Sequence, residues 1–125
     1  MDENALSNLI INRALTVHSA LGPGLLESAY KECLFHELSS SGIFVEKEKP
    51  VPLVYRDVKL ECGYRIDILV ERKVVIEVKS VEGLNDLHLA QVITYLRLSD
   101  CRLGLLLNFN VISMKNGIRR VVNKI

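Results

Sequence analysis

Hydrophobic residues recur along this chain with two different periods, and the change of period separates helices from strands. Over residues 4–39 they return every three or four positions, which is typical of helices that pack one face on a core. From residue 43 they alternate with polar residues or form short apolar runs, which favour strands. The pattern predicts helices over residues 4–21, 25–39 and 85–99, and strands over residues 43–49, 51–55, 58–70, 74–81, 102–109 and 118–122. This order predicts an α/β fold with a central mixed β-sheet flanked by helices and with an N-terminal helical pair.

Two of the apolar runs carry charges that a buried strand should not hold. Residues 64–70 and 74–78 flank a polar tripeptide at 71–73 and together predict a β-hairpin. Asp67 interrupts the first run, and Glu77 and Lys79 interrupt the second. Because an unpaired carboxylate is costly to bury, these groups need a common partner.

The length of the hairpin loop decides whether these charged side chains meet. Side chains two residues apart on a strand share a face, so Glu77 and Lys79 are neighbours. Asp67 joins them only if the loop has an odd number of residues, since a two-residue turn would put the acids on opposite faces. We therefore predict a three-residue loop or a bulge at 71–73, although no glycine eases it. The same register predicts one apolar face made of Ile66, Ile68, Val70, Val74, Ile76 and Val78.

Composition limits the class of protein without selecting a function. With 125 residues, of which 49% are hydrophobic and 25% charged, residues 1–125 are expected to form a single domain. The net charge of +1 gives no strong field toward nucleic acid, so a polyanion would have to bind at a local patch. Cys33, Cys62 and Cys101 form no CxxC pair and are expected to be free thiols. The chain starts with no signal-peptide pattern and has no apolar run long enough for a membrane span, so we expect a cytoplasmic location and no membrane partner.

The charged residues of the hairpin suit metal-assisted hydrolysis of phosphodiesters. Asp67 and Glu77 offer hard oxygen ligands for Mg²⁺ or Mn²⁺, which bind one or two carboxylates and complete their shell with water and phosphate. Lys79 beside them can stabilise charge on a phosphorane or hold the attacking water. On the residues alone, both a metal site and a structural ion-pair cluster remain open.

Separated motifs in this chain resemble a known family. An acid at Asp67 followed by Glu77-Val78-Lys79 is similar to the pattern of the PD-(D/E)XK nuclease superfamily, with Ile66 in place of the proline. Gln91-Val92-Ile93-Thr94-Tyr95 on the next helix resembles the Q-x-x-x-Y motif of its RecB-like branch. The stretch 24–30, GLLESAY, resembles the motif that names the small GxxExxY proteins, and 104–109 and 117–120 are also similar to that family.

The resemblance implies a restriction-endonuclease-like core and a role for each motif. Asp67 and Glu77 would hold the metal together with the backbone carbonyl of Val78 and with Glu27, and Lys79 would act on water and the transition state. Gln91, Tyr95 and Tyr30 would contact the substrate. Other interpretations stay open: Glu27 and Tyr30 also suit an ordinary helix start, and Gln91 and Tyr95 an ordinary i,i+4 pair.

Two functions from different classes follow. The first is a metal-dependent nuclease that binds nucleic acid and cleaves its phosphodiester bonds. The second is a non-catalytic module that retains the fold and binds nucleic acid or protein, or oligomerises. For either function, sequence specificity would need a homodimer or a partner protein. The basic residues Arg119, Arg120 and Lys124 could meet phosphates, but a solvated charged strand is the more ordinary explanation for them.

Overall fold

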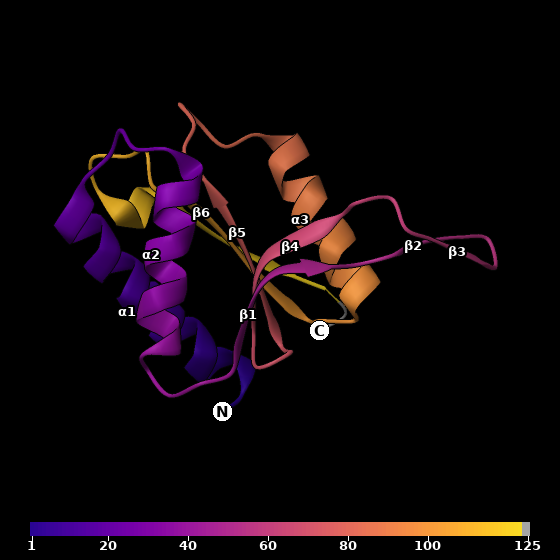
Figure 1. Ribbon diagram of the computed structural model, residues 1–125. Helices are drawn as coiled ribbons and strands as arrows, with labels where there is room; N and C mark the ends of the chain where they lie inside the picture. The colour runs from indigo at the N-terminus through magenta and orange to yellow at the C-terminus, as the bar shows by residue number, and fades with distance from the viewer. Residues whose placement is uncertain (124–125) are drawn as a thin grey trace.

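A five-stranded sheet with the order β1-β4-β5-β6-β7 forms the centre of the computed structural model, which describes residues 1–123 (Figure 1). Its strands are β1 (Val45–Pro50), β4 (Arg65–Val70), β5 (Val74–Lys79), β6 (Leu103–Asn108) and β7 (Ile118–Val122). Strands β5 and β6 run parallel and the other neighbours are antiparallel, so the sheet is mixed as predicted. The basic residue Lys124 lies outside the described residues.

Helices cover both faces of this sheet. The helical pair α1 (Glu3–Leu21) and α2 (Glu27–Ser39) lies on one side, and α3 (Asp86–Ser99) lies on the other (Figure 1). The carboxylate of Asp2 caps α1 by accepting a hydrogen bond from the Ala5 N–H at 2.8 Å. Asn85 and His88 form a capping box at the start of α3. All three predicted helices are confirmed.

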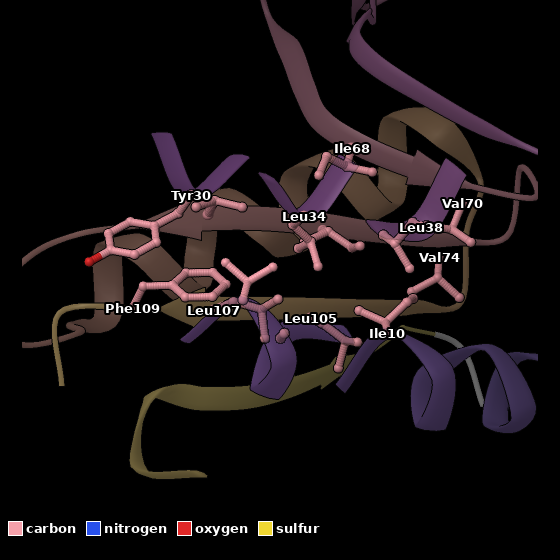
Figure 2. Packing of buried hydrophobic residues seen from close by; sticks show 14 of the residues in the cluster. Ile10, Tyr30, Leu34, Leu38, Ile68, Val70, Val74, Leu105, Leu107 and Phe109 are labelled. Atoms are coloured by element: carbon pink, nitrogen blue, oxygen red, sulfur yellow. The ribbon is translucent and has the colours of Figure 1, made fainter. Parts of the chain in front are cut away.

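The core consists of two apolar clusters, one on each face of the sheet. The larger cluster joins α1 and α2 to the sheet and includes Ile10, Leu34, Ile68, Val74 and Leu105 (Figure 2). The smaller cluster joins α3 to the opposite face through Val92 and Leu96 against Leu69, Val75 and Leu106. The absence of a side chain at Gly104 allows α3 to approach β6, since a Cβ there would lie 2.6 Å from Val92 Cγ1. Burying a large aliphatic side chain contributes about 1.5–3 kcal/mol, so these clusters fix the sheet that carries the charged residues.

A short hairpin projects from the edge of the sheet. It consists of β2 (Leu53–Tyr55) and β3 (Val58–Leu60), joined by Arg56-Asp57 (Figure 1). The prediction of one strand over residues 58–70 is wrong, because the chain leaves the strand conformation between Leu60 and Arg65 and Gly63 has a φ of +79°. The hairpin exposes Val54, Tyr55 and Val58 by more than half of their surface. Its apolar side chains are therefore left largely uncovered.

Ile66 departs from the face predicted for it. Ile68, Val70, Val74, Ile76 and Val78 share the larger cluster as predicted, but Ile66 packs in the smaller one. The backbone pairing of β4 with β5 runs from Val70 to Ile68. At Asp67 carboxylates take the place of the backbone partners, so the alternation of faces is interrupted there.

No helix within residues 1–123 combines the length and the apolar character that crossing a membrane requires.

Candidate active site

The loop between β4 and β5 sets the register that the charged residues need. Val70 pairs with Val74, which leaves a three-residue loop at 71–73 and confirms the prediction. Glu71 and Arg72 supply the positive φ values, 51° and 57°, that glycine provides in other tight turns. The Lys73 N–H closes the turn by donating to the Val70 carbonyl at 2.9 Å. Extending this register places Asp67 opposite Glu77.

Asp67 and Glu77 bind each other's strand. The Asp67 N–H donates to Glu77 Oε2 at 2.9 Å, and the Val78 N–H donates to Asp67 Oδ2 at 2.8 Å. Glu77 is only 3% exposed, and its burial together with the negative charge of Asp67 raises the pKa of Glu77 to about 8. Burial also raises the pKa of Asp67, against the effects of the Val78 hydrogen bond and of Lys31 and Lys79. The pair is thus a buried site where a second negative charge is unfavourable without a cation.

Lys79 ends β5 and is fixed through its backbone. It lies opposite Asn108 of the parallel strand β6, and its carbonyl accepts a hydrogen bond from the Phe109 N–H at 3.0 Å. The buried side chain of Asn108 accepts from the Val81 N–H and donates to the Val81 carbonyl, at 3.1 and 3.0 Å. These contacts hold the chain after β5 and leave the half-buried Lys79 side chain near both acids.

The start of α2 lies beside the end of β5. The Ser80 hydroxyl donates to the Leu25 carbonyl at 2.7 Å, which ties the turn before α2 to this strand. Glu27 is the first residue of α2 and is exposed, and its negative charge adds to the raised pKa of Glu77. Glu27 therefore lies close enough to the acids for its charge to act on Glu77, at a helix end that favours negative charge.

Tyr30 holds this turn together from inside the core. It is fully buried, its hydroxyl donates to the Gly22 carbonyl at 2.5 Å, and it accepts from the Leu25 N–H at 3.1 Å. Its ring stacks on Phe109 with 4.7 Å between centroids, as the labelled rings in Figure 2 show. A side chain in this position has no surface for a substrate, so the predicted substrate contact of Tyr30 is corrected to a structural role.

The helix α3 brings Tyr95 and Gln91 toward the acids. Tyr95 is 5% exposed, and its burial raises its pKa, with further increases from the charges of Glu77 and Asp67. The Gln91 side chain lies within hydrogen-bonding reach of the Tyr95 hydroxyl and opposes that shift. Tyr64 meets Tyr95 edge-on at 6.3 Å. The charges of both acids therefore act on Tyr95 of α3, and the roles of Gln91 and Tyr95 in binding substrate stay a prediction.

One comparison with known proteins decides the family. A sequence model of the PD-(D/E)XK nuclease superfamily matches residues 4–121, nearly the whole chain. The chain belongs to this superfamily. The sheet order and the helices on both faces agree with the restriction-endonuclease-like fold of the superfamily. No curated protein and no solved structure gave a match.

The donor set of this PD-(D/E)XK chain fits a magnesium or manganese ion. Within residues 1–123 no group of three or more His, Cys, Asp or Glu side chains gathers to hold a metal, so Glu27 does not form a ready-made cluster with the acid pair. Mg²⁺ needs only one or two carboxylates, because water and phosphate oxygens complete its octahedron. Asp67 and Glu77 meet this need, and burial together with the charge of Asp67 raises the pKa of Glu77, which a bound cation would lower again.

Two site residues escaped the sequence analysis. Lys31 of α2 brings its Nζ to 3.8 Å from Asp67 Oδ1 and to 3.5 Å from Glu48 Oε1 of β1. The signal for Lys31 was its position four residues after Glu27, which puts both on one face of α2. No sequence signal marks Glu48, because alternating charges on an edge strand are ordinary.

Proposed function

We propose that the chain is a metal-dependent nuclease that hydrolyses phosphodiester bonds of nucleic acid with Mg²⁺ or Mn²⁺. The observation that carries this proposal is the reciprocal pair of Asp67 and Glu77, buried between two strands and followed by Lys79. Membership of a nuclease superfamily supports it, since nucleases of this superfamily generally use divalent metals. We also propose that residues 1–125 act as one nuclease-like domain.

The acid pair would hold the metal. Asp67 and Glu77 supply carboxylate oxygens, and the Val78 carbonyl follows them on β5. Glu27 would approach as a further ligand of the metal or of its water. A bound Mg²⁺ would lower the pKa of a coordinated water and offset charge on the phosphoryl oxygens. The hydrogen bonds from the Asp67 and Val78 amides keep both carboxylates in place before any ion arrives.

The other side chains would act on the substrate. Lys79 presents an ammonium group beside the acids, where it would stabilise the phosphorane and orient the attacking water. Gln91 and Tyr95 offer an amide and a hydroxyl from α3, which would bind a phosphate next to the scissile one. Tyr95 carries a raised pKa and so keeps its proton as a hydrogen-bond donor at neutral pH.

Within the superfamily we assign the chain to the RecB-like branch and to the GxxExxY group. The support is the position of the motif residues. The charges of Asp67 and Glu77 act on Tyr95, which Gln91 contacts, and the charge of Glu27 at the start of α2 acts on Glu77. Tyr30 fixes the turn that precedes Glu27. These relations support the assignment of the motif residues to one site.

A cleavage assay tests the proposal. End-labelled DNA and RNA, single- and double-stranded, are incubated with wild type, Lys79→Ala and the control Lys73→Ala, whose ammonium lies in the exposed loop and donates to the Met1 carbonyl. We expect metal-dependent cleavage by wild type and by the control, and a rate about 10²–10³-fold lower for Lys79→Ala. Equal rates for all three proteins would refute the role of Lys79.

A second candidate function keeps the fold without the reaction. The exposed Val54, Tyr55 and Val58 of the β2–β3 hairpin favour a binding or oligomerisation module, in which a second copy of the chain covers this surface. Light scattering decides this, with Tyr55→Ser and Val58→Ser as variants. A dimer that dissociates in the variants, together with no cleavage by wild type, would favour the second candidate.

A further inference from the structure

A lysine from α2 lies between two carboxylates at the edge of the acid pair. Lys31 Nζ is 3.5 Å from Glu48 Oε1 and 3.8 Å from Asp67 Oδ1. The Lys31 side chain is 18% exposed and that of Asp67 20%, whereas that of Glu48 is 49% exposed. The ammonium group is thus shared by one inner and one outer acid.

The contacts of Asp67 show what this lysine blocks. Asp67 Oδ2 already accepts the Val78 N–H at 2.8 Å, and Oδ1 is the oxygen that faces Lys31. A cation that binds Asp67 would therefore meet the Lys31 ammonium at Oδ1. Two positive charges at one oxygen repel each other, so the ion and the lysine compete for it.

The backbone of Glu48 places the outer acid where it can receive the lysine. Glu48 lies within β1, yet its φ is +52°, a conformation that a residue with a long side chain rarely adopts. Such a conformation is strained and persists only where its surroundings hold it. The pairs Lys47 with Ile68 and Lys49 with Ile66 hold β1 on both sides of it.

We propose that Lys31 is the resident counter-ion of Asp67 in the metal-free protein, and that Glu48 receives Lys31 when a metal ion binds. This inference rests on the proposed function, because it concerns the metal held by Asp67 and Glu77. Lys31 and Glu48 then set the affinity for the ion without touching it. They are positioning residues: Lys31 lowers the affinity for the ion, and Glu48 raises it.

Substitutions of Lys31 and of Glu48 should change the affinity for Mn²⁺ in opposite directions. Lys31→Met removes the competing charge, so it should tighten Mn²⁺ binding about threefold to fivefold, the range of a partly exposed charge pair. Glu48→Gln leaves Lys31 with Asp67 alone, so it should weaken binding by a similar factor. Lys31→Arg retains the charge and should stay close to wild type.

The double variant separates this device from a direct effect of Glu48 on the metal. If Glu48 acts only through the lysine, Lys31→Met/Glu48→Gln binds Mn²⁺ as tightly as Lys31→Met alone. If Glu48 attracts the ion directly, Glu48→Gln weakens binding by the same factor in both backgrounds. That second result would overturn the proposal.

A matched control exists at the same interface. Lys47 of β1 and Glu32 of α2 form an ion pair at 2.6 Å, which joins the same two elements with the charges exchanged. Lys47→Met changes the net charge as Lys31→Met does, but its ammonium has no contact with Asp67. It should leave the affinity for Mn²⁺ unchanged.

The experiment is a calorimetric titration of the full chain with MnCl₂ for wild type and all five variants, with thermal unfolding to verify that each is folded. Tighter binding by Lys31→Met, weaker binding by Glu48→Gln and an unchanged Lys47→Met support the inference. Binding by wild type with no tightening in Lys31→Met, or equal tightening in Lys47→Met, overturns it and leaves the proposed function intact. A wild type that binds no Mn²⁺ overturns the proposed function itself.

Discussion

Metal binding at the acid pair should release a proton, and Glu77 is the residue that we expect to lose it. This carboxylate is buried, and its pKa is raised to about 8 by burial and by the charge of Asp67. At neutral pH it therefore holds a proton in the metal-free protein. A metal ion needs the ionised carboxylate, so the ion and the proton exclude each other.

The number of protons released, and the change of metal affinity with pH, follow from the pKa of Glu77. At about pH 7 roughly nine-tenths of Glu77 is protonated, so each bound Mn²⁺ should release about 0.9 proton from this residue. The apparent affinity should rise about tenfold per pH unit below the pKa of about 8 and level off above it. Protons released by Asp67, whose pKa is also raised, would add to this count.

Isothermal titration calorimetry measures the proton count directly. Mn²⁺ is titrated at neutral pH in buffers of different ionisation enthalpy, and the slope of the observed heat against that enthalpy gives the protons released. The titration is then repeated from mildly acidic to mildly alkaline pH. In the comparison variant Glu77→Gln the residue has no proton to release, and binding should be weak with little dependence on pH.

Two results would contradict this reasoning. One is binding of Mn²⁺ by wild type with no proton released at neutral pH, which would mean that Glu77 is already ionised or does not hold the ion. The other is an affinity that stays constant across the pH range. Either result would show that Glu77 does not exchange a proton for a bound cation.

Three further predictions concern stability. The pKa of Glu77 is raised from 4.5 to about 8 in the fold, so the free energy of unfolding should be highest at acid pH and should fall as the pH rises from 4.5 toward 8. Glu77→Gln cannot ionise, so in urea unfolding it should lack this decrease, which amounts to up to about 5 kcal/mol. Gly117→Ala should cost more than about 2 kcal/mol, because its Cβ would lie 2.0 Å from the Asn108 carbonyl oxygen, whereas Gly83→Ala meets nothing within 4 Å and should be nearly neutral in thermal unfolding. Glu48→Gly should raise the free energy of unfolding by up to about 1 kcal/mol, since glycine adopts the φ of +52° without strain; a loss of stability would argue against strain at this position.

The acid pair could be predicted from the sequence because its geometry is local. Residues two apart on a strand share a face, and the parity of one loop decides whether Asp67 joins Glu77, so counting residues was sufficient. The break in the sheet pattern at Ile66 could not be counted in this way. It arises because side-chain carboxylates, and not backbone carbonyls, accept the backbone N–H groups at this point of the two strands. The rule that side chains alternate between the two faces of a sheet does not include this case.

Residues that depend on packing between distant segments were harder to assign. Lys31 meets Asp67 and Glu48 only because α2 lies across β1 and β4, which no pattern within either segment specifies. Only the resemblance suggests that Tyr30 contacts substrate, whereas its helical spacing with Leu34 and Leu38 favours burial, and all three side chains are fully buried. A helical stripe is thus better evidence for burial than a motif is for contact with substrate.

The most direct test of the account is the rate of phosphodiester cleavage with and without Mn²⁺, in wild type and in Asp67→Asn. The substitution keeps the size of the side chain and removes the charge that would hold the ion. We predict cleavage by wild type only when Mn²⁺ is present, and no cleavage by Asp67→Asn at the same metal concentration. Equal rates for the two proteins, or full activity of wild type in a chelator, would contradict the assignment of this site.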